Sequence, residues 1–306
     1  MKHIYGPVPS RRLGFSLGVD LTPRKICSFD CIYCQLGETT KKTLERHEYM
    51  PVKDVIAEVK DFIDSGQRCD YITMSGSGEP TLNSGIGEVI DAVKSMSDIP
   101  VAVLTNSSLL SDYRVREDIS SADVILPSLD AVTQKNFEKV NRPCHEMKIS
   151  DIMEGLIKLK REFEGSVWLE VMVVEGLNTD DSEIESLKKV IDMINPDKVH
   201  LNTVVRPPAE EHAKPVNWEK LKEIGKFLDA EVIADFKRGA ADDRKGEKED
   251  LMLDLLRRRP CTLKDISSAL GLHENEAVKI LDQLSIDGVV GKERTCKGVY
   301  YFERVK

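Results

Sequence analysis

The amino-acid sequence predicts an α/β fold: a partial (β/α)6 barrel of six or so units, followed by a small C-terminal domain of three helices and two strands. Three observations support this prediction. Strand-like apolar runs alternate with amphipathic helix patterns over roughly the first 230 residues. The composition then changes at a charged stretch, and helix patterns without long intervening strands follow. The chain of 306 residues is long enough for one barrel and one small additional domain.

The predicted strands are continuous apolar runs that end in small polar residues, as expected of a parallel sheet covered by helices. They lie at residues 71–75, 101–105, 124–128, 167–174 and 198–203. The predicted helices repeat apolar residues every three or four positions. They lie around residues 55–63, 149–161, 181–194 and 218–228. In such a fold the active site lies beyond the carboxyl ends of the strands.

The chain divides into three parts, because residues 235–250 have almost no apolar content. These parts are a core domain at 1–235, a charged linker at 236–250 and a C-terminal domain at 251–306. The last part is expected to contain helices at 251–257, 262–270 and 274–286, then strands near 288–290 and 298–302. Thr262 begins a capping pattern and Gly271 ends the helix that follows. The three arginines of 257–259 are expected at a solvated helix end.

Three cysteines in one short stretch carry the strongest chemical signal. Cys27, Cys31 and Cys34 occur in the run CSFDCIYC. Thiolates at this spacing can hold three corners of a cubic iron–sulfur cluster and leave the fourth iron open for chemistry. A zinc site is the alternative, but structural zinc usually takes four ligands in two pairs, and no second close Cys or His pair follows. The cluster is therefore favoured over zinc.

A disulfide framework is less favoured than either metal site. The chain has seven cysteines, an odd number, and four of them are widely scattered. The N-terminus lacks an apolar signal core, which predicts a cytoplasmic protein with reduced thiols and no membrane segment.

A glycine-containing turn follows the first predicted strand of the alternating series. It comprises Gly76, Gly78 and Glu79, followed by Pro80. Glycine lets the backbone approach a ligand closely, and Glu79 offers a carboxylate. An ordinary strand-to-helix turn is the alternative.

Small polar residues also end the next two predicted strands. They are Thr105, Asn106, Ser128 and Asp130. All four would lie at the edge of the sheet where the active site is expected, so they are candidate ligand-binding residues. Helix N-capping is an equally weighted alternative, because these residue types satisfy the free amides of a helix start.

Two later strands carry polar residues that a buried strand would not choose freely. Glu170 and Met172 share one strand face, and His200 and Asn202 share another. If these faces point into the barrel, they border the substrate cavity. For His200 we favour the alternative, the exposed start of a strand.

The cysteine loop resembles the signature of the radical S-adenosylmethionine (SAM) superfamily, because Tyr33 precedes the last cysteine and the glycine turn follows one strand later. The resemblance implies that the three cysteines ligate a 4Fe–4S cluster and that the Gly76–Glu79 turn binds the methionine amine of SAM. It also implies a SAM-binding surface that includes Tyr33 and the four small polar residues at the strand ends.

The resemblance further implies how the reaction starts. A low-potential donor of the flavodoxin or ferredoxin type reduces the cluster, and SAM is cleaved to methionine and a 5′-deoxyadenosyl radical. The radical abstracts hydrogen from a substrate that the sequence does not identify, whether RNA, peptide or small molecule. Cys144 is a candidate catalytic residue that could return a hydrogen atom, although an incidental thiol is the favoured reading.

The N-terminal run from Tyr5 to Gly14, with its paired Arg11 and Arg12, resembles stand-alone radical SAM proteins related to tRNA wyosine-base synthases. This likeness covers residues 1 to about 235. It implies that the two arginines lie near the cluster, where they could pair with the SAM carboxylate; ordinary surface cations are the alternative. Wyosine synthesis itself is not expected, because that reaction uses a second cluster and no cysteine precedes Cys27.

The C-terminal domain resembles a winged helix-turn-helix domain, which commonly reads DNA with its second helix. That helix, at 274–287, bears four acidic residues and one lysine, a poor surface for phosphates. The domain as a whole has ten Lys or Arg against eight Asp or Glu, and the chain has a formal net charge of -9. We therefore favour docking of a substrate or partner protein over binding of nucleic acid. Nucleic-acid binding remains the alternative, because the expected wing carries the basic residues Lys292, Arg294 and Lys297.

Two classes of function therefore compete. One is a radical SAM enzyme of unknown reaction; the other is an iron–sulfur regulator that acts through its winged-helix domain. The glycine turn after the three cysteines favours the enzyme, because a pure sensor needs no SAM-binding turn.

Overall fold

The computed structural model describes residues 3–233, 248–295 and 298–304. Its main feature is an eight-stranded sheet with the strand order β1-β2-β5-β6-β7-β8-β9-β10. The strands are β1 (Ile4–Ser10), β2 (Gly14–Asp20), β5 (Tyr71–Ser75), β6 (Val101–Thr105), β7 (Val124–Pro127), β8 (Ser166–Val173), β9 (Lys198–Thr203) and β10 (Glu231–Val232). Every neighbouring pair is parallel except β1 and β2, which form an antiparallel hairpin. The predicted parallel α/β fold is therefore confirmed.

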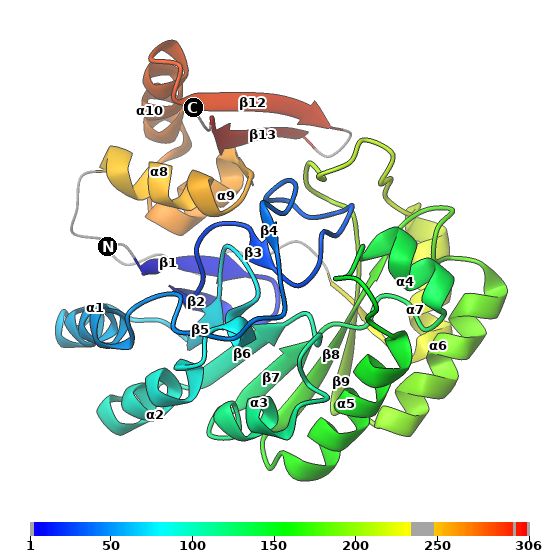
Figure 1. Cartoon of the computed structure of the whole chain (residues 1–306). Coiled ribbons are helices and arrows are strands. Elements are labelled where there is room, and N and C mark those ends of the chain that lie inside the picture. Colours follow the sequence, from blue (N-terminus) through cyan, green and yellow to red (C-terminus); the bar gives the residue numbers. More distant parts are fainter. Residues whose placement is uncertain (1–2, 234–247, 296–297, 305–306) are drawn as a thin grey trace.

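Helices follow the strands along the chain and lie along the outer side of the curved sheet (Figure 1). They are α1 (Val52–Asp64), α2 (Ile86–Met96), α3 (Tyr113–Asp118), α4 (Gln134–Val140), α5 (Ile149–Glu162), α6 (Asp181–Ile194) and α7 (Trp218–Leu228), with a 3-10 turn, η1 (Pro80–Leu82). Each longer helix buries one apolar face; α1, for example, buries Val52, Val55, Val59 and Phe62. This burial removes apolar surface from water and holds the helices on the sheet.

The ends of the helices follow from local sequence. Asp180 caps α6 by accepting a hydrogen bond from the backbone N–H of Glu183, and Asn195 ends the helix in the left-handed conformation. Both residue types favour these positions. The bounds of α6, α7, β5, β6 and β9 are those predicted from the sequence.

The C-terminal part forms a second unit with its own core. It consists of α8 (Lys248–Arg258), β11 (Cys261–Thr262), α9 (Leu263–Leu270), α10 (Glu274–Ile286), β12 (Val290–Thr295) and β13 (Gly298–Glu303), with the three strands in the order β11-β13-β12. Thr262 and Asp265 form the predicted capping box of α9, and Gly271 ends that helix with a φ of 65°. The expected helices and paired strands are confirmed, and β11 adds a third strand.

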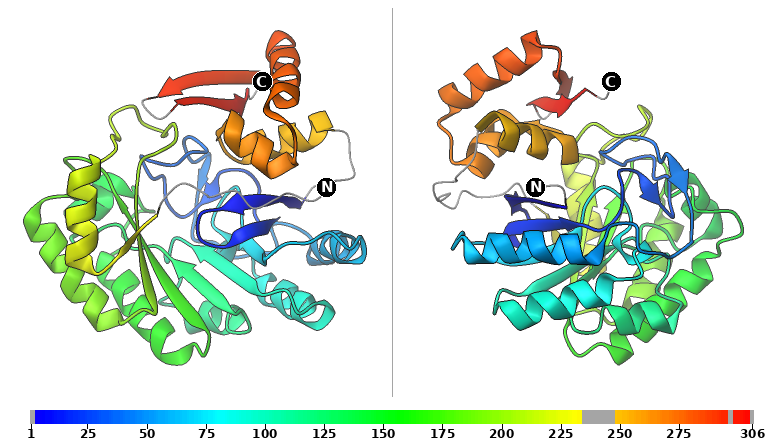
Figure 2. Two further views of the ribbon diagram at one scale, coloured as in Figure 1. Left: turned by 180° about the vertical axis from the view of Figure 1, so that it is seen from behind. Right: turned by 60° about the vertical axis from the view of Figure 1, so that its left-hand side comes forward.

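The C-terminal unit packs on the β1–β2 hairpin (Figure 2). Val8 of β1 belongs to the same apolar cluster as Met252, Leu255 and Leu270, and Tyr5 packs against it. This docking brings the end of α8 to the edge of the sheet at which the cysteine loop lies. The predicted linker falls largely outside the described residues, and its last three residues, 248–250, already belong to α8.

No helix among the described residues is both long enough and apolar enough to cross a membrane.

Candidate functional site

The three cysteines lie in one loop above the carboxyl ends of the strands. Cys27 ends the short strand β3 (Ile26–Cys27), which pairs with β4 (Lys41–Lys42). The backbone N–H of Cys34 donates to the carbonyl oxygen of Cys31 at 3.0 Å, and that of Ile32 donates to Val140 at 3.0 Å. These bonds shape the segment from Cys31 to Cys34 as a tight turn anchored to Val140.

Each of the three sulfur atoms has a nitrogen donor within hydrogen-bonding distance. Lys25 Nζ lies 3.2 Å from Cys34 Sγ. The amide nitrogens Nδ2 of Asn106 and Asn141 lie 3.5 Å from Cys27 Sγ and Cys31 Sγ. Hydrogen bonds to cysteine sulfur are one of the means by which a protein sets the potential of an iron–sulfur cluster.

The donor set fits a 4Fe–4S cluster. Burial raises the pKa of Cys27 to about 12 and raises the pKa of Cys31, so these thiols need a nearby positive charge in order to ionise. Iron supplies that charge on binding. Among the described residues, no three His, Cys, Asp or Glu side chains are grouped to hold a single metal ion. A 4Fe–4S cluster does not require three side chains to converge on one ion, because each thiolate binds a different iron. The three thiols of this loop are soft ligands of the kind that iron–sulfur clusters prefer.

The predicted glycine turn packs directly against the cysteine segment. A Cβ atom on Gly78 would lie 2.0 Å from the carbonyl oxygen of Ile26, next to Cys27. Gly76 has a φ of +129°, and a Cβ there would lie 2.4 Å from Asp20 Oδ1. Both positions therefore require glycine, since a side chain at Gly78 would separate the turn from the cysteine segment and one at Gly76 would collide with Asp20 of β2.

Glu79 is only 2% exposed, and donors from the protein surround its carboxylate. Oε1 accepts hydrogen bonds from the hydroxyls of Thr81 and Thr105, each at 2.6 Å, and Oε2 accepts one from the backbone N–H of Asn106 at 2.7 Å. The carboxylate thus ties the glycine turn to the end of β6. It does not line the cavity of about 390 Å³ beside the cysteine loop, so its predicted contact with the SAM amine stays a prediction.

Asp130 also lies behind the cysteine loop, where it is buried. Its carboxylate accepts hydrogen bonds from the hydroxyl of Tyr33, from Asn141 Nδ2 at 2.6 Å and from the backbone N–H of Met172 at 2.9 Å. Because Asn141 also contacts Cys31, the carboxylate orients one of the sulfur donors. Burial raises the pKa of Asp130, although all three donors oppose that shift.

The N-capping alternative is wrong for the four small polar residues at the strand ends. The helices that follow are capped by Asp112 and Thr133 instead. Thr105, Asn106 and Asp130 make the contacts described above, and Ser128 lines a small cavity of about 10 Å³ together with Asn106 and Asp130. These residues support the cysteine loop and the glycine turn.

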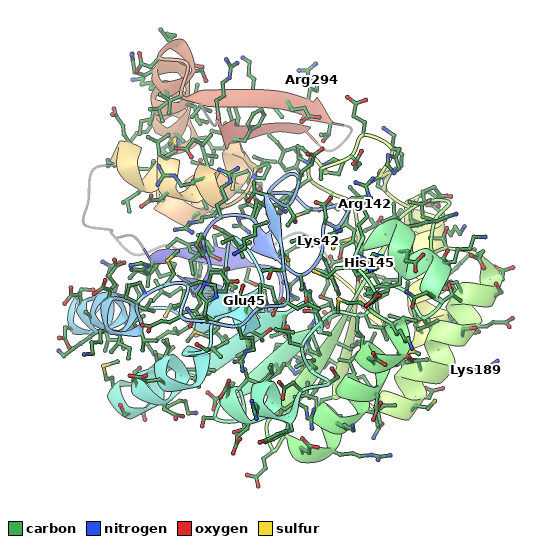
Figure 3. The ribbon with its side chains drawn as sticks, in the orientation of Figure 1. Lys42, Glu45, Arg142, His145, Lys189 and Arg294 are labelled. Atoms are coloured by element: carbon green, nitrogen blue, oxygen red, sulfur yellow. The ribbon has the colours of Figure 1, made fainter. Side chains whose placement is uncertain are left out.

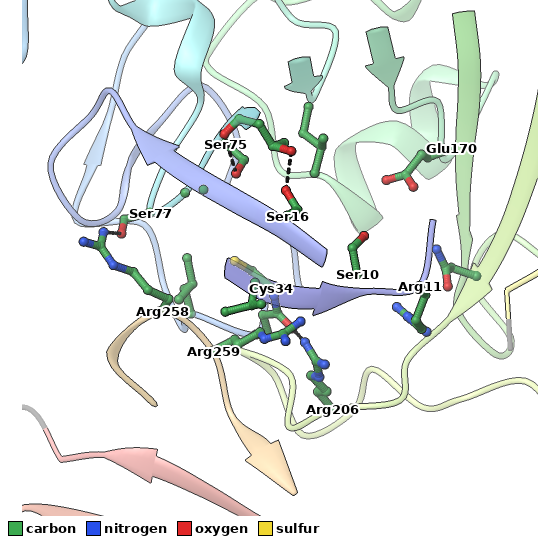
Figure 4. A pocket seen from close by; sticks show the side chains of 18 of the residues that line it. Ser10, Arg11, Ser16, Cys34, Ser75, Ser77, Glu170, Arg206, Arg258 and Arg259 are labelled. Atoms are coloured by element: carbon green, nitrogen blue, oxygen red, sulfur yellow. Dashed lines mark hydrogen bonds between the residues drawn. The ribbon is translucent and has the colours of Figure 1, made fainter. Parts of the chain in front are cut away.

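A cavity of about 390 Å³ opens beside the cysteine loop (Figure 4). Of the predicted site residues, it is lined by Cys27, Tyr33, Cys34, Gly76 and Gly78. The opposite strands contribute Glu170, Met172 and Asn202, which places these strand faces inward. Cys31, Glu79, Thr105, Asn106, Ser128 and Asp130 do not line it.

His200 does not line the cavity, and its expected position at an exposed strand start is wrong. The residue is 3% exposed. The neighbouring strand β10 and the ring of Trp168 cover it, with ring centroids 5.7 Å apart. Burial lowers the pKa of His200 to about 4, so the side chain is neutral at neutral pH.

Five arginines line the cavity, and the sequence singled out only two of them. Arg11 and Arg12 come from the turn after β1, Arg206 from the segment after β9, and Arg258 and Arg259 from the end of α8. Arg257 is exposed, as expected of a solvated helix end, but the next two residues point into the cavity. No local sequence signal distinguishes them from Arg257, because only the docking of α8 on β1 gives them this position.

Cys144 lies outside this cavity. It lines a separate depression together with Arg142, His145 and Lys148, of which Figure 3 labels Arg142 and His145. Its backbone N–H donates to the carbonyl oxygen of Ser28 at 3.0 Å, so the residue packs on the outer side of the cysteine loop. A role in returning hydrogen to a substrate radical stays a prediction that this position does not favour.

The sequence matches known proteins along most of its length. The profile of the Radical SAM superfamily matches residues 21–188. A UPF0026 protein of Methanocaldococcus jannaschii is 36% identical over 222 residues, which cover 72% of this chain and 69% of that protein. A protein of Brachyspira hyodysenteriae named GTPase Obg is 36% identical over 299 residues, or 95% of this chain. The matched part is 44% of that relative, so the chain spans less than half of its length.

The fold is similar to that of solved radical SAM structures. Streptococcus suis SuiB bound to S-adenosylmethionine matches with a TM-score of 0.53 and 13% identity, over 68% of this chain and 45% of that chain. At this identity the likeness concerns the fold alone. The cysteine loop, the glycine turn and these matches agree. The chain therefore belongs to the radical SAM superfamily, whose members are enzymes that use a 4Fe–4S cluster and S-adenosylmethionine, and within it to the UPF0026 proteins.

Proposed function

We propose that this protein cleaves SAM reductively and uses the resulting radical to abstract hydrogen from a substrate held in the 390 Å³ cavity. One observation carries the proposal: Cys27, Cys34 and the glycine turn open onto the same cavity as Glu170 and Asn202 from the opposite strands. Cofactor and substrate groups can therefore meet in one space. When bound, the cluster supplies the electron that breaks a carbon–sulfur bond of SAM and yields the 5′-deoxyadenosyl radical.

The residues of this chain would act by holding and orienting these groups. Cys27, Cys31 and Cys34 bind iron as thiolates. Lys25, Asn106 and Asn141 donate hydrogen bonds to the three sulfurs and so stabilise the added negative charge of the reduced state. Gly76 and Gly78 let the backbone approach the methionine part of SAM, while Glu79 keeps their turn in position.

We further infer that the sheet is the partial (β/α)6 barrel of radical SAM proteins and that the C-terminal unit is a winged helix-turn-helix domain. The N-terminal motif supports a relation to the wyosine-base synthases. Their activity is not transferred, because no cysteine precedes Cys27 to hold a second cluster. The GTPase named in the Brachyspira relative likewise belongs to that protein, of which this chain matches 44%.

The proposed electron donor is a low-potential flavodoxin or ferredoxin. The proposed partner of the C-terminal unit is a substrate or partner protein, and the proposed location is the cytoplasm. Nucleic acid is not favoured. Helix α10 carries Glu274 and Glu276 in its first turn, where a DNA-reading helix would approach phosphates. The other side of the C-terminal unit packs on β1, where Arg258 and Arg259 line the cavity.

Anaerobic reconstitution with iron and sulfide, followed by reduction with dithionite, tests the proposal. We expect SAM to be converted to 5′-deoxyadenosine and methionine. Deuterium transfer from a labelled candidate substrate into 5′-deoxyadenosine would identify the substrate class. Absence of SAM cleavage in fully loaded protein, together with tight binding of DNA, would instead support an iron–sulfur regulator.

A further inference from the structure

The cavity has one wall that is unusually rich in arginine. We call the side chains of Arg11, Arg206 and Arg259 the arginine wall. They come from the turn after β1, the segment after β9 and the end of α8, which are far apart in the sequence. Figure 4 labels the three side chains; they lie close enough for the charge of Arg259 to add to burial in lowering the pKa of Arg206, and for that of Arg206 to add to burial in lowering the pKa of Arg11.

Two further arginines of the cavity are neutralised by carboxylates, so they differ from the arginine wall. Arg12 Nε lies 2.7 Å from Glu170 Oε1. Arg258 forms an ion pair with the buried Asp20 and donates a hydrogen bond to Ser77 Oγ at 3.0 Å. The charges of Arg12 and Arg258 are therefore balanced by carboxylates of the core domain.

The arginine wall has polar partners but no paired carboxylate. Arg206 Nη1 donates to Gln35 Oε1 at 3.0 Å, and Arg259 Nη2 donates to the carbonyl oxygen of Pro9 at 3.2 Å. Within residues 3–233, 248–295 and 298–304, no carboxylate lies within 4.0 Å of these three guanidinium groups. Arg259 Nε is buried, and no partner for it is found among the same residues.

Like charges in this arrangement repel one another. The pKa of Arg11 falls to about 10, first because of burial and then because of Arg206, with Arg12 and Arg259 adding to the effect and the carboxylate of Glu170 partly opposing it. Holding several half-buried cations close together costs free energy, because they lose hydration and repel one another. A bound anion offsets this cost. One carboxylate, such as that of SAM, carries a single charge and would leave the wall mostly uncompensated.

We propose that the arginine wall binds the phosphate groups of a small-molecule substrate. This inference rests on the proposed function, because it names the substrate class for the same cavity. Guanidinium forks match phosphate oxygens in pairs, and three of them suit a group with several negative charges. A small molecule is favoured over RNA because the cavity has a volume of only about 390 Å³ and the chain is formally at -9.

The proposal also gives the C-terminal unit a role in the site. Arg259 belongs to that unit, and its guanidinium reaches across to Pro9 of β1. Without the docking of α8, the cavity would lose one of its three uncompensated cations. The C-terminal unit therefore completes the phosphate site.

Calorimetric titration of the anaerobically reconstituted protein with inorganic pyrophosphate tests the inference. We expect saturable binding, and we expect Arg206→Gln and Arg259→Gln each to weaken it roughly 10-fold, since each removes charge-assisted hydrogen bonds. Arg259→Lys retains the positive charge but not the forked guanidinium, so it should weaken binding less than Arg259→Gln does. This conservative variant distinguishes loss of the phosphate contact from loss of the fold. Arg294→Gln is the matched control, because Arg294 is exposed on the outer strand β12 (Figure 3).

Three outcomes would overturn the inference. The first is no pyrophosphate binding, or equal binding by the wild type and the arginine-wall variants. The second is displacement of pyrophosphate by saturating SAM, which would assign the arginines to the SAM carboxylate. The third is displacement by an oligoribonucleotide without terminal phosphate, which would indicate a nucleic-acid backbone. A failure to form 5′-deoxyadenosine would contradict the proposed function alone, because pyrophosphate binding is measured separately.

Discussion

Two walls of the same cavity are built in opposite ways. The cysteine wall, formed by the cysteine loop and the glycine turn, is supported from behind by polar groups that are paired within the protein. Glu79 and Asp130, which do not line the cavity, accept several hydrogen bonds each, and each cysteine sulfur has a donor nearby. On the arginine wall, three cations face the cavity, and none of them has a paired carboxylate among the residues that the structure describes. The first wall is complete except for its metal, whereas the second is complete only with a ligand.

The contrast between the two walls separates the cofactor, which all members of the superfamily share, from the substrate, which is specific to this enzyme. A cofactor that must be held in one geometry needs ligands that are fixed beforehand, which internal hydrogen bonds provide. A substrate that must enter and leave is recognised by groups that remain available to it. The cysteine wall thus corresponds to the chemistry common to the superfamily, and the arginine wall to the substrate of this chain.

The largest expected effect breaks the cysteine wall. Cys31→Ala removes one of three iron ligands, so we expect loss of bound iron and at least a roughly 100-fold drop in 5′-deoxyadenosine formation, beyond what loss of a supporting hydrogen bond produces. Iron analysis and chromatography after anaerobic reconstitution measure both. Cys69→Ala is the control, because Cys69 precedes β5, at the end of the sheet opposite the cysteine loop. Normal SAM cleavage by the Cys31 variant would refute the cluster assignment.

A second change loosens the arginine side by undocking α8. Arg258→Met leaves the buried carboxylate of Asp20 without its cation, which we expect to destabilise the contact by about 3–5 kcal/mol. Hydrogen–deuterium exchange should rise in α8 and β1. The double variant with Asp20→Asn should recover part of the protection, since it removes the unpaired charge. Unchanged exchange in the single variant would argue against this ion pair as a link between the two units.

A third change tunes the cysteine wall without removing a ligand. Lys25→Met deletes the ammonium group that lies 3.2 Å from Cys34 Sγ. We expect a more negative midpoint potential, because the positive charge favours the reduced cluster, and roughly 10-fold slower SAM cleavage with a fixed reductant. A redox titration followed by electron paramagnetic resonance measures the shift. Lys42→Met is the control, as its ammonium group instead contacts the carbonyl oxygen of Arg142. Equal potentials in the wild type and both variants would remove Lys25 from this role.

The smallest expected effect is a change in pyrophosphate affinity at the arginine wall. Glu170→Gln removes the carboxylate that pairs with Arg12 and so adds a fourth uncompensated guanidinium to the cavity. Pyrophosphate should bind more tightly by about 1 kcal/mol, or roughly 5-fold, in the calorimetric titration described above. Weaker binding in this variant would mean that Arg12 must be held by Glu170 for the site to form.

Much of this fold could be predicted from the sequence, because the relevant signals are local. The apolar runs of β5, β6 and β9 and the helix patterns of α6 and α7 have the expected bounds, and the capping box at Thr262 lies where its residue types indicate. The β1–β2 hairpin was not predicted. Its sequence contains prolines and glycines and no regular alternation, so its pairing became evident only next to β5.

The candidate site was predictable to a smaller degree. The cysteine loop and glycine turn were found because their ligands are close together in the sequence. The roles of Lys25 and Asn141 were missed, since a donor to sulfur has no characteristic sequence context. The sequence around His200 favours an exposed strand start, whereas β10, a two-residue strand, buries this residue.

The alternating α/β core, the two-part organisation and the spacing of three cysteines are evident in the sequence, because periodicity, capping and ligand spacing act over a few residues. Which polar side chains face the cavity, and which support it from behind, depends on the packing of distant segments. This packing brings Arg11, Arg206 and Arg259 together, because the docking of α8 on β1 through Val8 and Leu255 is a contact between distant segments, and no local pattern encodes where such segments meet.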